Sequence, residues 1–160
     1  MELYHGSNVE VKEPKILSIQ KTADFGMGFY TTSSLQQAKD WARIKTGRRG
    51  FGNPCVSSFE FDDEQAKKKL EIKYFHEADD DWLEFVVANR KGTYAGKKFD
   101  LVVGPVADDQ TITVIDNYIR GLLSSKVALA ELEPQNLTDQ YAFLTNASLN
   151  HLKTIGVENG

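Results

Sequence analysis

The sequence predicts an α+β fold in a single domain that spans residues 1–160. Three observations lead to this prediction. A chain of 160 residues is long enough to bury a sizeable core. Its 41% hydrophobic and 26% charged residues are typical of globular proteins. Finally, short strand-like and helix-like segments alternate irregularly, whereas a parallel α/β fold would show a regular repeat.

In the first third of the chain we expect a strand over residues 2–6, a loop over 14–24, and a glycine-containing turn leading into a strand over 25–32. Ser34 and Gln37 form an S-x-x-Q capping box, which predicts a helix through about Lys45. Trp41 falls on the apolar face of that helix, and Gly47 is a plausible stop signal.

The rest of the chain continues the mixed pattern. We expect a strand over 55–61, a helix over 62–69, an extended segment over 70–75, a helix from 79 to about 90, a strand over 99–106, helices over 113–123 and 126–133, a strand over 140–145, and a helix over 147–153 that Asn146 caps.

The charge and the cysteine content exclude several classes of function. A net charge of −4 argues against a protein that binds nucleic acid mainly through charge. The single cysteine, Cys55, excludes an intrachain disulfide, and the three histidines share no metal-ligand spacing, so we expect no metal. The N-terminal residues do not resemble a signal peptide, and no apolar run is long enough to span a bilayer. We therefore expect a cytoplasmic protein with no membrane partner.

Two short motifs carry the functional signal: Leu3-Tyr-His-Gly-Ser7 and Phe25-Gly-Met-Gly-Phe-Tyr-Thr31. The Gly26-Met-Gly28 step alone is too short for a Rossmann fingerprint. In this order the motifs resemble the ADP-ribosyltransferase superfamily, in the H-Y-E branch of poly(ADP-ribose) polymerases and diphtheria-type toxins. The whole chain is also similar to a small bacterial family of unknown function assigned to that superfamily, a resemblance that extends through residues 100–109 and 140–143. It implies a split β-sandwich, with two small sheets around an NAD cleft and flanking helices.

The resemblance implies NAD as co-substrate. His5 would bind a ribose hydroxyl, Gly6 would let the nicotinamide carboxamide approach the backbone, and Ser7 and Thr31 would complete the NAD-binding residues. Tyr30 and Trp41 would sandwich the cationic nicotinamide ring, where each aromatic face contributes about 0.5–2 kcal/mol if desolvated. The alternative for Trp41 is a plain core residue on an amphipathic helix.

The third catalytic position departs from the family, because Gln140 stands where the H-Y-E branch has Glu. An amide still binds a ribose hydroxyl, but it supplies no negative charge to an oxocarbenium-like transition state. Transfer of a single ADP-ribose is therefore expected, and polymer synthesis is not. Asp139 points to the opposite face of its strand and is a poor substitute.

Five further residues are weaker candidates. Glu84 is a candidate for the missing carboxylate. Asp108 and Asp109 would cap the next helix or line the acceptor side of the cleft. Arg48 and Arg49 would meet the NAD phosphates or form a solvated loop.

The leading hypothesis is thus a mono-ADP-ribosyltransferase with His5, Tyr30 and Gln140 as catalytic residues and an unidentified protein or nucleic-acid acceptor. The resemblance also implies a small neutralising partner, as in bacterial toxin–antitoxin pairs. The alternatives are an inactive module that binds NAD, ADP-ribose or a protein, and an NAD glycohydrolase, for which water is the acceptor.

Overall fold

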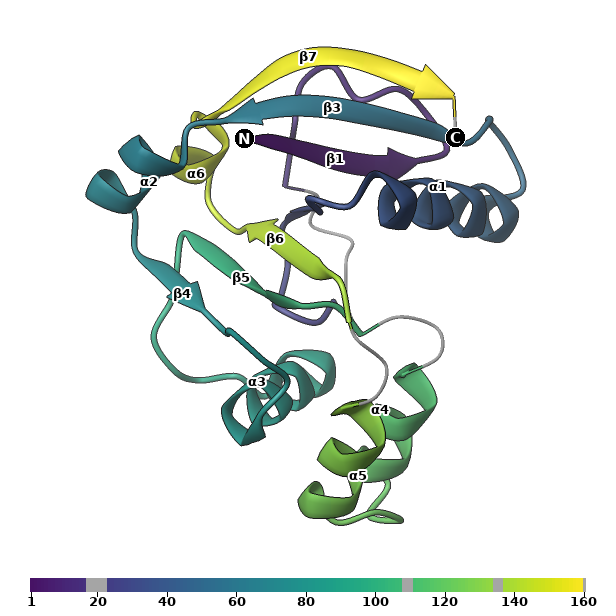
Figure 1. Ribbon diagram of the computed structural model, residues 1–160, viewed down its shortest axis with the longest axis vertical. Coiled ribbons are helices and arrows are strands. Elements are labelled where there is room, and N and C mark those ends of the chain that lie inside the picture. Colours follow the sequence, from purple (N-terminus) through teal and green to yellow (C-terminus); the bar gives the residue numbers. More distant parts are fainter. Residues whose placement is uncertain (17–22, 108–110, 134–136, 160) are drawn as a thin grey trace.

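The computed structural model describes residues 1–16, 23–107, 111–133 and 137–159, which form an α+β structure with two small sheets and six helices (Figure 1). The α+β prediction is therefore confirmed. In chain order the elements are β1 Glu2–Ser7, β2 Phe29–Thr31, α1 Leu35–Arg49, β3 Cys55–Phe61, α2 Asp63–Lys69, β4 Ile72–Tyr74, α3 Asp80–Lys91, β5 Leu101–Pro105, α4 Ile112–Ile119, α5 Ser125–Leu132, β6 Asp139–Phe143, α6 Asn146–Leu149 and β7 Leu152–Asn159.

The first sheet has the strand order β1–β3–β7 and is antiparallel throughout. In its register His5 of β1 lies opposite Ser57 of β3. β7 pairs with the other side of β3, and the register shifts between Ser58 and Phe59, as in a β-bulge. His5 is therefore held on an edge strand whose partner is paired on both sides.

The second sheet has the order β2–β6–β5–β4, and only the β4–β5 pair is parallel. Tyr30 of β2 lies opposite Ala142 of β6. Because Gln140 precedes Ala142 by two residues, Tyr30 and Gln140 project from the same face of this sheet. An isolated antiparallel bridge between Tyr4 and Thr32 joins the two sheets.

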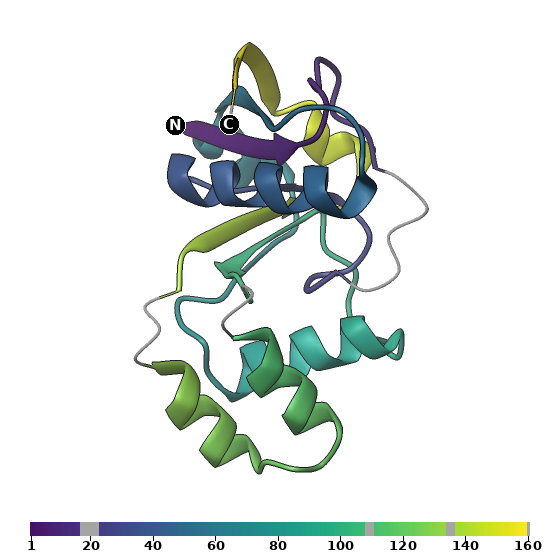
Figure 2. The same cartoon turned by 90° about the vertical axis from the view of Figure 1, so that its right-hand side faces the viewer.

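Two apolar cores cover the two faces of the second sheet. One lies between the sheets and includes Leu3, Phe59 and Phe143. The other lies between the second sheet and α3, α4 and α5, which Figures 1 and 2 show below that sheet. Trp82 of α3 is fully buried in this second core, and its indole N–H donates to the Pro105 carbonyl oxygen at 2.9 Å.

Helix α1 begins as predicted and ends later than predicted. The Ser34 side chain accepts the Gln37 backbone N–H at 3.1 Å, which caps the helix. The predicted stop at Gly47 is wrong, because the helix runs on to Arg49. Gly50 takes up the left-handed conformation, with φ 72°, and its N–H bonds to the Thr46 carbonyl.

The C-terminal prediction also needs correction. A helix over 147–153 was expected, but α6 ends at Leu149 and β7 begins at Leu152. The cap is Thr145, not Asn146: its side chain accepts the Ser148 N–H in a capping box. Pairing with β3 extends the last residues as a strand, which local helix signals do not reveal.

Candidate functional site

His5 is linked directly to the second motif. Its Nδ1 lies 2.7 Å from the Tyr30 carbonyl oxygen, and because a carbonyl only accepts, Nδ1–H is the donor. The neutral ring then offers Nε2 as an acceptor. Burial, with a smaller effect from the Lys45 charge, lowers the pKa of His5 to about 4. The ring also stacks on Phe29, with centroids 4.2 Å apart. His5 is thus neutral near pH 7 and fixed in one orientation.

Gly6 and Ser7 follow His5 in β1, and both are buried. A Cβ on Gly6 would lie 2.0 Å from the Ala38 carbonyl oxygen, so the glycine allows α1 to pack on β1. Figure 2 shows α1 lying along β1. The Ser7 hydroxyl donates to Asn8 Oδ1 at 3.3 Å. The packing of α1 on β1 therefore accounts for a glycine at position 6 by itself. The predicted contact of Gly6 with a ligand is a separate role.

Tyr30 fixes the turn that precedes its own strand. Its hydroxyl donates to the Gly26 carbonyl oxygen at 2.5 Å and accepts the Phe25 N–H at 2.9 Å. Burial, reinforced by the Asp24 carboxylate, raises the pKa of Tyr30, so the phenol stays protonated. Thr31 is fully buried, and its hydroxyl donates to the Tyr141 carbonyl oxygen at 3.1 Å. Thr31 thus joins two strands and does not line the cavity described next.

A cavity of about 670 Å³ lies beside both motifs. We call it the His5 cavity and define it by His5, Ser7, Tyr30, Lys45 and Arg49, which all line it. The rest of its lining comes from the segment after β1 and from Gly28 and Phe29 at the start of β2. Its volume is within the range of about 300–1,000 Å³ that is usual for small-molecule and cofactor sites.

The charge in the His5 cavity is mainly positive, with four cations and two carboxylates in its lining. Lys45 and Arg49 lie one turn apart on α1, and both line the cavity. Burial lowers the pKa of Lys45, and the Arg49 charge lowers it further. Neither forms an ion pair with another described residue. An anion in the cavity would offset the repulsion between these two cations.

Trp41 does not line the His5 cavity. It lies on α1 one turn before Lys45 and is half-buried. The predicted buried face of α1 is confirmed for Ala38 and Ala42, which are fully buried and pack with Val56, whereas Trp41 itself is only partly buried. The two alanines allow the helix backbone to approach Gly6 of β1 closely. A role in stacking on nicotinamide stays a prediction.

Gln140 is 2% exposed and does not line the His5 cavity. Its Nε2 donates to Asp24 Oδ2 at 3.0 Å, with a longer contact of 3.4 Å to the Pro105 carbonyl oxygen. Both neighbours are acceptors, which determines the orientation of the amide. On the other face of β6, Asp139 accepts the Ser33 N–H at 2.9 Å, in line with the prediction that it points away.

No sequence pattern predicts the buried ion pair next to Gln140. Asp24 is 6% exposed, forms a salt bridge with Arg90 of α3, and accepts the Ala107 N–H at 3.1 Å. Asp24 ends a polar stretch for which the sequence predicts a loop. Arg90 lies in the last turn of a helix, where basic residues are common. No local signal pairs two residues so far apart in the chain. A carboxylate thus lies beside position 140, although position 140 itself is neutral.

Of the weaker candidates that the structure describes, only Arg49 lines the His5 cavity. Glu84 is exposed on α3 and accepts the Tyr118 hydroxyl at 2.5 Å. Arg48 is exposed and does not line the cavity. Asp108 and Asp109 lie outside the described residues. Within the described ranges, no group of His, Cys, Asp and Glu side chains is arranged to hold a metal ion.

The protein thus has an α+β fold with a basic cavity beside its first sheet. The model of the family described as "Protein of unknown function (DUF3990)" matches residues 1–154, so the chain belongs to that family. No curated protein and no solved structure matches it. No helix in the part of the chain that the structure describes is long and apolar enough to cross a membrane. The expected cytoplasmic location stays a prediction.

Proposed function

We propose that this protein is a mono-ADP-ribosyltransferase with an ADP-ribosyltransferase-like arrangement of its two sheets. It would cleave NAD, release nicotinamide and transfer ADP-ribose to a macromolecular acceptor. One observation carries the proposal: His5 and Tyr30, from the two motifs, line the same cavity and are joined by a hydrogen bond of 2.7 Å. The volume of about 670 Å³ suits a ligand of dinucleotide size.

The charges of the His5 cavity support a ligand with phosphate groups. NAD carries an anionic diphosphate between its two nucleosides. Lys45 and Arg49 line the cavity without an ion pair to another described residue, so they are suited to bind that diphosphate. Neutral His5 then accepts a ribose hydroxyl at Nε2 and adds no charge near the cationic nicotinamide.

In the proposed reaction, the bond between the nicotinamide nitrogen and ribose C1 breaks, and its electron pair leaves with nicotinamide. An acceptor nucleophile forms the new bond to C1 and releases a proton. Tyr30, with Trp41 as its predicted partner, orients the nicotinamide ring. Gln140 is neutral and adds no charge stabilisation to the transition state, so we expect slow transfer of single ADP-ribose units.

Release of nicotinamide from NAD tests the proposal. The full chain should release nicotinamide, and Tyr30→Ala should abolish the release. Tyr30→Phe should retain most of it, because stacking needs the ring. His5→Ala should lower kcat/KM by roughly tenfold to a hundredfold, the loss of one or two useful hydrogen bonds. The control is Glu84→Gln, since Glu84 does not line the His5 cavity. No release by the wild-type chain, without or with candidate acceptors, would refute the enzymatic function.

A second candidate, binding of NAD or ADP-ribose without cleavage, is favoured by Gln140. It is nearly inaccessible, and its amide is already engaged by Asp24 and Pro105. Titration calorimetry with ADP-ribose separates the two functions. Saturable binding that Arg49→Gln weakens, together with no nicotinamide release, would support the binding module. Absence of both binding and release would exclude both functions.

A further inference from the structure

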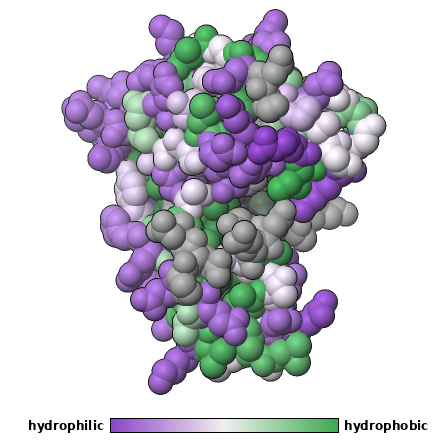
Figure 3. All heavy atoms as spheres, turned by 45° about the vertical axis from the view of Figure 1, so that its right-hand side comes forward, coloured by the Kyte–Doolittle hydropathy of each residue, from purple (hydrophilic) through white to green (hydrophobic). Residues whose placement is uncertain are grey.

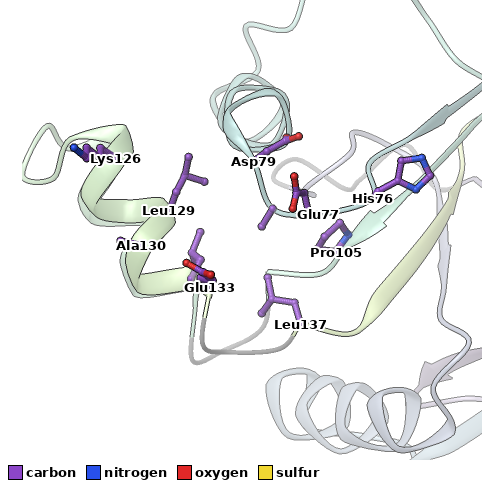
Figure 4. Close-up of a pocket in the computed structure, with 11 residues that line it drawn as sticks. His76, Glu77, Asp79, Pro105, Lys126, Leu129, Ala130, Glu133 and Leu137 are labelled. Atoms are coloured by element: carbon purple, nitrogen blue, oxygen red, sulfur yellow. The ribbon is translucent and has the colours of Figure 1, made fainter.

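A second cavity, of about 640 Å³, has no part in the proposed function. It lies between α5, the connection from β4 to α3, and the end of β5 (Figure 4). We call it the α5 groove and define it by Glu77, Pro105, Leu129, Ala130, Glu133 and Leu137. It is on the side of the second sheet that carries α3, α4 and α5, and it shares no lining residue with the His5 cavity.

The apolar part of the groove is one face of α5. Lys126, Leu129, Ala130 and Glu133 line it at helical spacing, so they form a single stripe along the helix. Ala128 packs in the core from the other side of α5. In Figure 4, the Leu129 and Leu137 side chains extend into the space between the walls. Leu129 and Leu137 are partly buried and pack against the same core, so the apolar floor of the groove is the outer surface of that core.

The walls of the groove are acidic. Figure 4 shows Glu77 on the β4–α3 connection and Glu133 at the end of α5, on opposite sides of the space, whereas the Lys126 ammonium points away from it. Neither glutamate forms an ion pair with another described residue. Asp79, which also lines the groove, is engaged as the cap of α3, where it accepts the Trp82 N–H at 2.9 Å. An aliphatic floor between carboxylates matches an aliphatic side chain next to a basic one.

The surface beside the groove favours a macromolecular ligand. Val127 follows Lys126 on α5 and is 45% exposed, and Leu122, just before α5, is 69% exposed. Figure 3 shows hydrophobic atoms gathered at this end of the molecule. A partner segment is large enough to cover exposed apolar side chains at this end of the molecule, which a small cation would leave exposed.

We propose that the α5 groove binds a segment of a partner protein in which an aliphatic residue is flanked by lysine or arginine. The aliphatic side chain packs between Leu129 and Leu137, and the basic side chain pairs with Glu77 or Glu133. This proposal is independent of NAD binding, because it uses a different cavity and different residues.

Selection of random peptides displayed on phage, with the full chain as target, tests the proposal. We expect the enriched peptides to combine Leu, Ile or Val with Lys or Arg. A synthetic copy of the best peptide should bind at one saturable site. The Glu77→Gln/Glu133→Gln variant should raise its Kd roughly tenfold, equivalent to about 1.4 kcal/mol. Leu129→Ser should weaken binding at least as much.

The matched control is Glu64→Gln/Glu158→Gln, which removes two exposed carboxylates that do not line the groove. It should leave the Kd within about twofold, which separates docking in the groove from attraction to net charge. Circular dichroism and thermal unfolding verify that every variant is folded. The proposal is overturned if no peptide is enriched, if the enriched peptides lack basic residues, or if the control and the groove variant change the Kd equally.

Discussion

The His5 cavity and the α5 groove are similar in volume, about 670 and 640 Å³, and opposite in charge. The His5 cavity combines two recognisable motifs with two cations of α1. The α5 groove is assembled from segments that each read as ordinary surface. The comparison shows that a sequence motif identifies a site only when the motif residues themselves line the cavity. A cavity lined by residues that belong to no motif is recognised only in the folded structure.

Asp24 lines neither cavity, but the loss of its buried carboxylate should have the largest effect on stability. Its carboxylate binds Arg90, Ala107 and Gln140 and precedes the turn held by Tyr30. Asp24→Asn leaves the Arg90 guanidinium, 19% exposed, without its counterion and should cost about 3–5 kcal/mol in urea unfolding. The control is Asp40→Asn, whose exposed ion pair with Arg43 should be worth less than about 1 kcal/mol. An equal loss of unfolding free energy in both variants would mean that the buried Asp24 ion pair stabilises the protein no more than the exposed pair of Asp40 and Arg43.

Exchanging the carboxylate of Asp24 and the amide of Gln140 tests the same network more directly. Gln140→Glu places a second carboxylate beside Asp24 in a buried position and should destabilise the fold. The double variant Asp24→Asn/Gln140→Glu restores one carboxylate and one amide. It should recover about 1–2 kcal/mol relative to the sum of the single effects in a double-mutant cycle. Strict additivity would show that the two side chains do not interact.

The next effect concerns only the His5 region. Gly6→Ala should destabilise the protein by about 3 kcal/mol, because the new Cβ would lie 2.0 Å from the Ala38 carbonyl oxygen and displace α1. Gly47→Ala is the matched control, since a Cβ there meets nothing within 4 Å. As an alanine inside a helix it should stabilise by about 0.5–1 kcal/mol. Thermal unfolding of the two variants should give shifts of opposite sign.

A smaller effect is expected in the pH dependence of stability. The pKa of His5 is lowered to about 4 in the folded chain, from 6.5. Between these values the unfolded chain binds more protons, so stability falls as pH falls from about 6.5 to about 4. The loss should reach about 2 kcal/mol, less than full burial would give because the ring is only half-buried. Urea unfolding from pH 7 to pH 4.5 should show this loss in the wild type and a smaller one in His5→Asn. Identical pH profiles would contradict it.

The smallest effect on stability is expected at Lys45. Lys45→Met removes a partly buried cation beside Arg49 and should change the free energy of unfolding by less than about 0.5 kcal/mol, toward greater stability. The same variant should weaken binding of ADP-ribose by roughly tenfold in calorimetry. The neighbouring Lys39→Met, which does not line the cavity, serves as control. An unchanged affinity in Lys45→Met would remove this residue from the proposed diphosphate site.

Prediction from sequence succeeded best where the signal is local. Ser34, Asp62 and Asp79 each cap a helix through a side chain that accepts a nearby backbone N–H, and these helices begin where expected. The two motifs also predicted that His5 and Tyr30 share one site. Both line the His5 cavity, but the hydrogen bond between them runs from the His5 ring to the Tyr30 backbone carbonyl, and their role toward a ligand stays a prediction. Helical spacing correctly grouped Ala38 and Ala42 on the covered face of α1, but spacing alone does not tell how deeply a neighbouring side chain such as Trp41 is buried.

What the sequence by itself determined is the starts of α1, α2 and α3, the strand over 55–61 and the two motifs beside the His5 cavity. Each depends on residues a few positions apart, whose hydrogen bonds form within one turn or along one strand. Tertiary structure decided the start of β7 at Leu152, the ion pair of Asp24 with Arg90, and both cavities. The residues involved are distant in the chain. Their interactions become favourable only after packing has brought them together and excluded water, so no local pattern encodes them.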